Sequence, residues 1–167
     1  QVSNRAAIYP QFDSYSDRLV IRDVFPGIDY DGGFTMKGPN LLGRGSPEEL
    51  AKVIFYKDDQ LFLVASALSF TLNEEKITSQ SVRAKFYLDK DSITHPGVNF
   101  TYINKDKALT LLREDQGVGA SPFFNSYHQL DMYFESIIWR RDRPFMKFGP
   151  IFGNTDKKAL FESATFF

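Results

Sequence analysis

The fold class is decided by the stretch Val82-Arg83-Ala84-Lys85-Phe86-Tyr87-Leu88. Apolar side chains occupy every second position from Val82, with Arg, Lys and Tyr between them. An extended chain places successive side chains on opposite faces, so this period of two predicts a strand with one face toward a core. A helix would need an apolar repeat near 3.6 residues. The polar residues that follow, Asp89-Lys90-Asp91, predict a tight turn into a second strand.

The same arrangement repeats through the middle of the chain. Polar turns recur roughly every 16 residues, at Lys57-Asp58-Asp59-Gln60, Asn73-Glu74-Glu75, Asp89-Lys90-Asp91 and Asn104-Lys105-Asp106-Lys107. The runs between these turns are rich in Phe, Tyr, Val, Ile and Thr, which suit a half-buried pleated surface. Connections this short join antiparallel strands, because parallel strands need long crossovers.

Both ends of the chain continue this pattern less regularly. Residues 33–38 and 41–45 form a glycine-rich hairpin candidate, residues 130–139 and 145–152 form another, and a last run at 159–167 would close the sheet. The sequence therefore predicts one all-β domain over residues 1–167. We expect an antiparallel sandwich or an elongated hairpin-repeat sheet, with at most one or two short helices.

Two segments carry signals of a helix start. Ser46-Pro47-Glu48-Glu49 is a capping box with Pro at the first helical position, and it predicts one or two helical turns that end before Ile54. The segment from Ser126 to Trp139 begins with a second capping box, and its apolar residues fit a helical stripe and a strand alternation equally well. Its aromatic and β-branched content favours strand. The longest break, at residues 114–125, is where we expect the sheet to change direction.

Composition limits the function. The chain has 167 residues and a formal net charge of −1, which excludes a strongly basic nucleic-acid binder. It has no Cys, so disulfides, thiolate metal sites and Cys nucleophiles are excluded together. No stretch approaches the roughly 20 apolar residues that a membrane helix needs, so no transmembrane segment is predicted. Only His95 and His128 are present, which rules out a three-His metal site within one chain.

The aromatic content is unusually high, with 17 Phe, 8 Tyr and 1 Trp. Most of these rings are expected to fill a thin β core, which needs large side chains. The alternative is that Tyr127, Tyr133 and Trp139 are exposed and stack on sugar rings, with His128 beside them. These four residues are the candidate ligand-binding site that the sequence offers.

Catalysis is not predicted. Ser121, His128 and Asp131 could be drawn together as a nucleophile, a base and an orienting acid, but the chain has no G-x-S-x-G elbow. Acid pairs two or four residues apart, such as Asp29 with Asp31, are typical of turns and lack the Ca²⁺-loop pattern. We therefore expect a non-enzymatic protein with no catalytic residues, no metal and no cofactor.

Several stretches carry a resemblance to a known group of proteins. They are Gly32-Gly33-Phe34-Thr35-Met36-Lys37-Gly38, Leu88-Asp89-Lys90-Asp91-Ser92-Ile93-Thr94-His95-Pro96-Gly97, Ser121-Pro122-Phe123-Phe124-Asn125-Ser126-Tyr127-His128-Gln129-Leu130-Asp131-Met132-Tyr133-Phe134-Glu135 and Phe161-Glu162-Ser163. The chain thereby resembles a segment of large, uncharacterised exported proteins of Bacteroidetes bacteria, from about Ile8 onward. The resemblance implies a fragment of a longer periplasmic or cell-surface protein, and it transfers no activity and no catalytic residues.

Three functions follow as expectations. The first is a non-enzymatic structural or interaction module of an exported envelope protein, with neighbouring domains of the same parent chain or another protein as partners. The second is a glycan-binding β-sandwich that uses exposed aromatic residues. The third, by analogy of fold alone, is a lipid-binding β-groove domain of the bacterial envelope.

Overall fold

A computed structural model describes residues 11–150 and 159–164. This part of the chain holds fourteen β-strands in one sheet and a short 3₁₀ helix, η1 (Gly117–Ala120). The recorded strand pairings are antiparallel, so the predicted all-β antiparallel class is confirmed. Among the described residues, no helix has the length and apolar character to cross a membrane.

The chain runs back and forth as a meander, in which each pass pairs with the pass before it and the pass after it. The strands are β1 (Gln11–Phe25), β2 (Ile28–Lys37), β3 (Asn40–Arg44), β4 (Ala51–Lys57), β5 (Gln60–Ala67), β6 (Ser69–Leu72), β7 (Lys76–Leu88), β8 (Asp91–Ile103), β9 (Ala108–Leu112), β10 (Phe123–Asn125), β11 (Leu130–Tyr133), β12 (Ser136–Arg140), β13 (Met146–Gly149) and β14 (Leu160–Ser163).

Several passes are made of two short strands placed end to end. β3 pairs with one half of β2 and β4 with the other half, so both lie along the same edge of β2. In the same way β5 and β6 share one edge of β7, and β9 and β10 share one edge of β8. β7 is continuous, but its register to β8 shifts between Ser79 and Ala84. Each pass is therefore interrupted or distorted near its middle.

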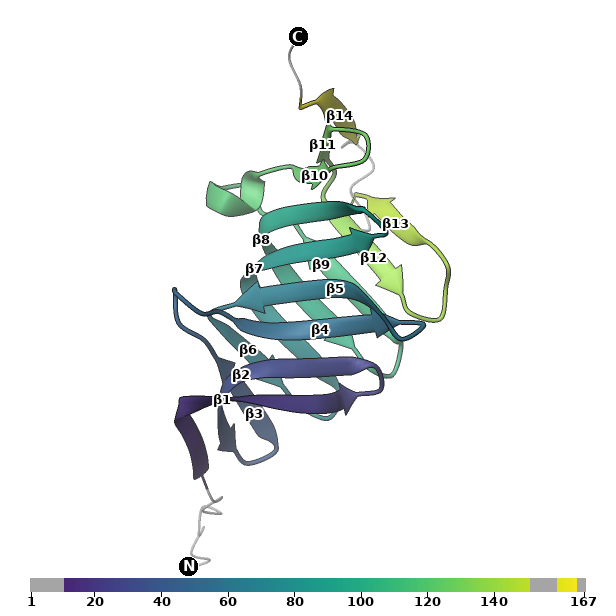
Figure 1. The fold of residues 1–167 in the computed structure, drawn as a ribbon. Coiled ribbons are helices and arrows are strands. Elements are labelled where there is room, and N and C mark those ends of the chain that lie inside the picture. The colour runs from purple at the N-terminus through teal and green to yellow at the C-terminus, as the bar shows by residue number, and fades with distance from the viewer. Residues whose placement is uncertain (1–10, 151–158, 165–167) are drawn as a thin grey trace, which may run out of the picture.

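These interruptions line up and bend the sheet over itself. We call this the bend line; it passes through Gly32–Gly33, Gly45–Leu50, Leu68, Ser79–Val82 and Pro96–Gly97. Figure 1 shows the result as two layers, with β4 and β5 in front and β6, β9 and β12 crossing behind them. The molecule is thus a sandwich whose layers are joined by strands that pass from one layer to the other, as in orthogonal sheet packing.

Tyr30 fixes one part of the bend line. Its side chain is fully buried, and its hydroxyl donates a hydrogen bond of 2.5 Å to the carbonyl oxygen of Gly33. A Cβ atom at Gly43 would lie 2.6 Å from Tyr30 Cε2, and one at Gly32 would lie 2.5 Å from Tyr30 Oη. Only glycine leaves room for the ring at these two positions. Burial raises the pKa of Tyr30 to about 12.

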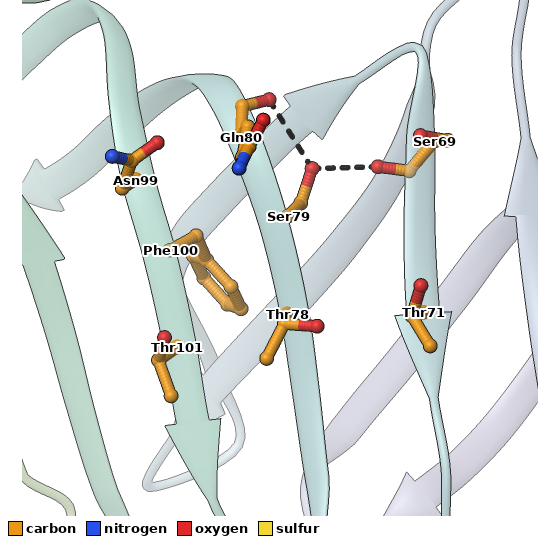
Figure 2. Close-up of a pocket in the computed structure, with 8 residues that line it drawn as sticks. All are labelled: Ser69, Thr71, Thr78, Ser79, Gln80, Asn99, Phe100 and Thr101. Carbon is orange, nitrogen blue, oxygen red and sulfur yellow. Dashed lines mark hydrogen bonds between the residues drawn. The ribbon is translucent and has the colours of Figure 1, made fainter.

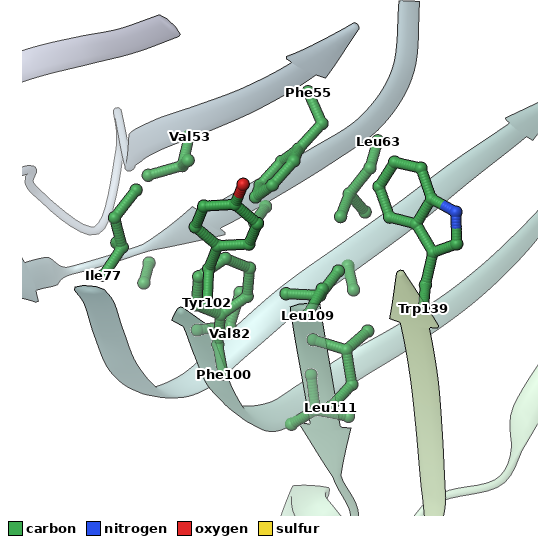
Figure 3. Close-up of a cluster of buried hydrophobic side chains, with 14 of the residues drawn as sticks. Val53, Phe55, Leu63, Ile77, Val82, Phe100, Tyr102, Leu109, Leu111 and Trp139 are labelled. Carbon is green, nitrogen blue, oxygen red and sulfur yellow. The ribbon is translucent and has the colours of Figure 1, made fainter. Parts of the chain in front are cut away.

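The core lies between the two layers and is largely aromatic. Figure 3 shows Phe55 and Leu63 of the front layer facing Tyr102, Leu109 and Trp139 of the back layer. The Phe55 ring lies 5.3 Å from the Tyr102 ring and 6.2 Å from the Trp139 ring, both edge to face. Such pairs add about 0.5–1.5 kcal/mol to the burial of each ring. The rings therefore hold the folded-over layers together.

The four predicted polar turns are all present. They join β4 to β5, β6 to β7, β7 to β8 and β8 to β9. Asp58, Asp59 and Asp89 adopt positive φ angles of 51°, 59° and 59°, which Asp tolerates better than most residues. The alternation that predicted β7 is also present, since Val82, Ala84 and Phe86 are buried. Leu88, expected on the buried face, is 36% exposed because the strand ends there.

The prediction of one or two helical turns between the capping box at Ser46 and Ile54 is wrong. The amide of Glu49 does donate to Ser46 Oγ at 3.1 Å, so the expected cap forms. The chain then enters β4 at Ala51 instead of continuing as a helix. Arg18 stabilises this loop by donating to the carbonyl oxygens of Glu49 and Leu50. Pairing of β4 between β2 and β5 outweighs the local helix signal.

The strand preference for the segment that starts at Ser126 is confirmed, because β11 and β12 occupy it. The break predicted at residues 114–125 contains η1 and ends in β10, and β9 and β10 both run antiparallel to β8, on either side of the bend line at Pro96–Gly97. Of the predicted closing run, Leu160–Ser163 forms β14, which pairs with β11. Residues 165–167 of that run, and residues 151–152 of the hairpin before it, lie outside the described residues.

Candidate functional site

A polar groove lies over the back layer, where β6, β7 and β8 run side by side. We call it the hydroxyl groove; its volume is about 500 Å³ and its lining is Ser69, Thr71, Thr78, Ser79, Gln80, Asn99, Phe100 and Thr101. Figure 2 shows the hydroxyl and amide groups of the three strands around it. A volume of this size falls in the range of small-molecule binding sites, about 300–1,000 Å³.

Strand register brings these side chains together. Thr71 on β6 is the cross-strand partner of Thr78 on β7, and Thr78 is the partner of Thr101 on β8. Direct partners in an antiparallel ladder point to the same face, so the three threonines form a row. The residues between them, such as Phe70 and Tyr102, point into the core and are buried. The threonine row therefore lies on the outer face of these strands, and their inner face is apolar.

Some of the polar groups in the groove are already hydrogen-bonded. Ser79 Oγ donates to the carbonyl oxygens of Ser69 at 2.6 Å and of Gln80 at 3.3 Å, as Figure 2 shows. Asn99 Nδ2 donates to Glu114 Oε1 at 2.8 Å. Asn99 Oδ1 is buried and has no hydrogen-bond partner in the described part of the chain. Figure 2 places this oxygen on the side of Asn99 that faces Gln80. A donor that reached it would satisfy a group whose burial now costs free energy.

The groove carries no ionisable lining residue. Hydroxyls without a neighbouring base are weak nucleophiles, and no lining group can transfer a proton near neutral pH. Threonine and serine hydroxyls and primary amides both donate and accept hydrogen bonds. Such a lining suits a neutral molecule that carries many hydroxyl groups.

The four residues predicted as a ligand site do not form one surface. Tyr127 and His128 lie together on the turn between β10 and β11, with their rings edge to face at 4.6 Å, and Tyr127 is 70% exposed. Tyr133 is half-buried on β11, with the guanidinium of Arg113 5.4 Å from its ring centre. Trp139 is 1% exposed. The exposure of Trp139 that the sugar-stacking alternative requires is therefore absent: β12 turns the indole into the core, against Phe62 at 4.4 Å.

Ser121 takes part in a contact other than the triad drawn from the sequence. Its carbonyl oxygen accepts from His95 Nε2 at 2.7 Å and from Arg113 Nε at 2.8 Å. His95 Nδ1 accepts from the Gly97 amide at 3.0 Å, which leaves the proton on Nε2. Burial lowers the pKa of His95, and the charge of Arg113 acts in the same direction. These bonds attach the segment between β9 and β10 to β8.

Asp29 and Asp31, the acid pair named from the sequence, and Asp91 of the turn between β7 and β8 are engaged in local contacts. Asp29 accepts from the Asp23 amide at 2.9 Å, Asp31 pairs with Arg18 at 3.2 Å, and Asp91 accepts from Ser126 Oγ at 2.9 Å. Within the described ranges, no group of three or more His, Cys, Asp or Glu side chains is placed to hold a metal ion.

The residues of the hydroxyl groove were not singled out from the sequence. A signal for them was present, since each of the short motifs Phe70-Thr71-Leu72 and Phe100-Thr101-Tyr102 places an uncharged hydroxyl residue between two buried ones. The equivalent outward positions Arg83 and Lys85 are charged. The missing information was the register that places these motifs beside each other.

Comparison with known proteins adds no family. No family model matches the chain, and neither a curated protein nor a solved structure is significantly similar to it.

Proposed function

We propose that this protein is a non-enzymatic binding module that holds a glycan in the hydroxyl groove. The observation that carries the proposal is the groove itself, about 500 Å³ in volume and lined by uncharged hydroxyl and amide side chains from three adjacent strands. Each sugar hydroxyl is both a donor and an acceptor, and so is each Thr, Ser, Asn or Gln side chain of the lining. The two surfaces match in hydrogen-bonding character and in charge.

The wider setting of the module rests on the resemblance to exported Bacteroidetes proteins. We place the module outside the cytoplasm, in the periplasm or at the cell surface, within a longer parent chain. Its other partners would be the neighbouring domains of that chain or another protein. Exposed edge strands support this, because β14 is paired with β11 and its Leu160 and Phe161 are each 52% exposed.

A lipid ligand is less well supported by the groove. An acyl chain would leave the hydroxyls of Thr71, Thr78 and Thr101 without hydrogen bonds while removing them from water. Burying an unpaired hydroxyl costs roughly 1–3 kcal/mol on protein scales. A polyhydroxylated ligand instead replaces the hydrogen bonds to water that these hydroxyls lose when the ligand covers them.

The test is a glycan array followed by calorimetry on the glycans that bind. The triple variant Thr71→Val, Thr78→Val, Thr101→Val removes three hydroxyls and keeps the shape and β-propensity of each side chain. Three neutral hydrogen bonds of about 0.5–1.5 kcal/mol each predict an affinity at least about tenfold weaker. Wild-type affinity in this variant would refute the proposal.

Two controls make the result specific. Thr94 lies on β8 outside the groove lining and pairs with Lys85, in the part of β7 that pairs with β5, so Thr94→Val should bind like the wild type. Tyr127→Ala tests the exposed turn that the sequence suggested. If Tyr127→Ala abolishes binding and the triple variant does not, the glycan is held at the turn and not in the groove.

A further inference from the structure

A second cavity lies on the hairpin of β12 and β13. Its volume is about 200 Å³ and its lining is Ile138, Arg140, Arg143, Phe145 and Lys147. We call it the cationic cavity, because three of these five side chains are positively charged and none is acidic. Phe145 is 53% exposed, so an aromatic ring is available beside the cations.

The cationic cavity and the hydroxyl groove belong to the same face of the sheet. Thr101 on β8 is the cross-strand partner of Thr110 on β9, Thr110 is the partner of Ile138 on β12, and Ile138 is the partner of Lys147 on β13. Direct partners point to one face, so the row of the groove continues to the cavity. Neighbouring strands lie about 4.8 Å apart, which puts the backbone of Lys147 roughly 14 Å from that of Thr101.

The charges of the cavity are unequally available. Arg140 is held by Asp142, with Nε and Nη2 each 3.2 Å from a carboxylate oxygen. The hydrogen bond from Arg140 lowers the pKa of Asp142, so this carboxyl stays ionised. The ion pairs found among the described residues do not involve Arg143 or Lys147. The charge of Arg143 also acts on Asp142 and helps to lower its pKa. The three cations of the cavity therefore have one adjacent carboxylate between them, which leaves a net positive charge.

We propose that the glycan bound by this face is acidic, with neutral hydroxyls in the hydroxyl groove and a carboxylate or sulfate group in the cationic cavity. The proposal rests on the proposed function and adds the substrate class. A guanidinium binds a carboxylate or sulfate through paired hydrogen bonds, and an ammonium group adds a point charge. Phe145 and Ile138 offer apolar surface to a sugar ring between the charged groups.

The experiment compares one sugar backbone with and without its charge. The probes are an oligogalacturonate and its methyl ester, which keeps the hydroxyls and removes the carboxylates. Binding of each is measured by calorimetry at low salt and again at about 0.5 M NaCl, where screening is strong. We expect the acid to bind more tightly than the ester at low salt, and the difference to shrink at high salt.

The test variant is Arg143→Gln with Lys147→Gln, and its matched control is Arg83→Gln with Lys85→Gln. Both double variants remove two exposed cations, but Arg83 and Lys85 lie on β7 in the segment paired with β5, on the front layer. The test variant should bind the acid about 3- to 10-fold more weakly at low salt, since two exposed ion pairs are lost. Its affinity for the ester should not change, and the control should bind both probes like the wild type.

The outcomes separate this inference from the proposed function. If the acid and the ester bind equally well, or if both double variants weaken the acid equally, the inference is overturned while groove binding stands. If neither probe binds the wild type and the glycan array is also empty, both proposals fail. If the acid binds the wild type and is weakened about 3- to 10-fold only in the Arg143→Gln, Lys147→Gln variant, with the ester unaffected, the acidic-glycan inference is supported.

Discussion

Replacing Gly43 with Ala tests the account of the bend line. The new Cβ would lie 2.6 Å from both Cε2 and Oη of Tyr30 and 2.7 Å from its Cζ. The ring cannot swing away freely, because its side chain is fully buried and its hydroxyl is bonded to the Gly33 carbonyl oxygen. Overpacking costs about 1–3 kcal/mol, and loss of the buried hydrogen bond adds about 1 kcal/mol or more. We expect a destabilisation of about 3 kcal/mol.

The assay is urea unfolding followed by the fluorescence of Trp139, the single Trp, which is buried in the core. With a typical slope of about 2 kcal/mol per M, a loss of 3 kcal/mol lowers the unfolding midpoint by about 1.5 M. Gly149→Ala is the matched control, because a Cβ there meets no atom within 4 Å. Its midpoint should stay at the wild-type value or rise slightly.

A double-mutant cycle identifies the cause. In a Tyr30→Leu background the ring is gone, so Gly43→Ala should then cost less than about 0.5 kcal/mol. If Gly43→Ala lowers the midpoint equally in both backgrounds, or leaves it unchanged in the wild type, contact with the Tyr30 ring is not the reason that position 43 requires glycine.

Three further predictions concern the pH dependence of stability and the hydrogen bonds of Arg141. The lowered pKa of His95 means that the unfolded state takes up a proton first, so stability should fall as pH decreases from 7 through 6.5 toward the folded pKa; in His95→Phe this slope should flatten. The Tyr30 pKa of about 12 predicts the reverse at alkaline pH: stability present below pH 10 should be lost between about pH 10 and 12, and Tyr30→Phe should remove that loss. Arg141 donates to the carbonyl oxygens of Pro26 and Tyr56, so Arg141→Ala should lower the urea midpoint, whereas the neighbouring Arg140→Ala should not.

The parts of the fold that depend on neighbouring residues could be predicted from the sequence. The turns are set by polar residues that tolerate positive φ, as Asp58 and Asp89 do, and the strand β7 by its own alternation. The bend line could not be predicted, because it depends on contacts such as that of Tyr30 with Gly43, which lies on the next strand. The helical turns between Ser46 and Ile54 were predicted wrongly for the same reason: a local signal was overridden by strand pairing.

The candidate site shows the same division. The sequence offered Tyr127, His128, Tyr133 and Trp139 as one candidate site on the condition that the rings are exposed. Tyr127 is exposed and lies beside His128, whereas Trp139 is buried, because alternation alone does not say which face of β12 meets the core. The hydroxyl groove depends on the register of three strands, with Thr71, Thr78 and Thr101 in one row. Register is a property of the assembled sheet and cannot be predicted from the sequence of any single strand.

The meander has a consequence for how this molecule folds and how it can change in size. Since each pass pairs with its immediate neighbours in sequence, the chain closes short loops and needs none of the long crossings of a Greek-key barrel. A hairpin added or lost at either edge would widen or narrow both layers together and would leave the pairing of the other strands unchanged. Evolution can therefore change the number of strands in such a sheet one hairpin at a time.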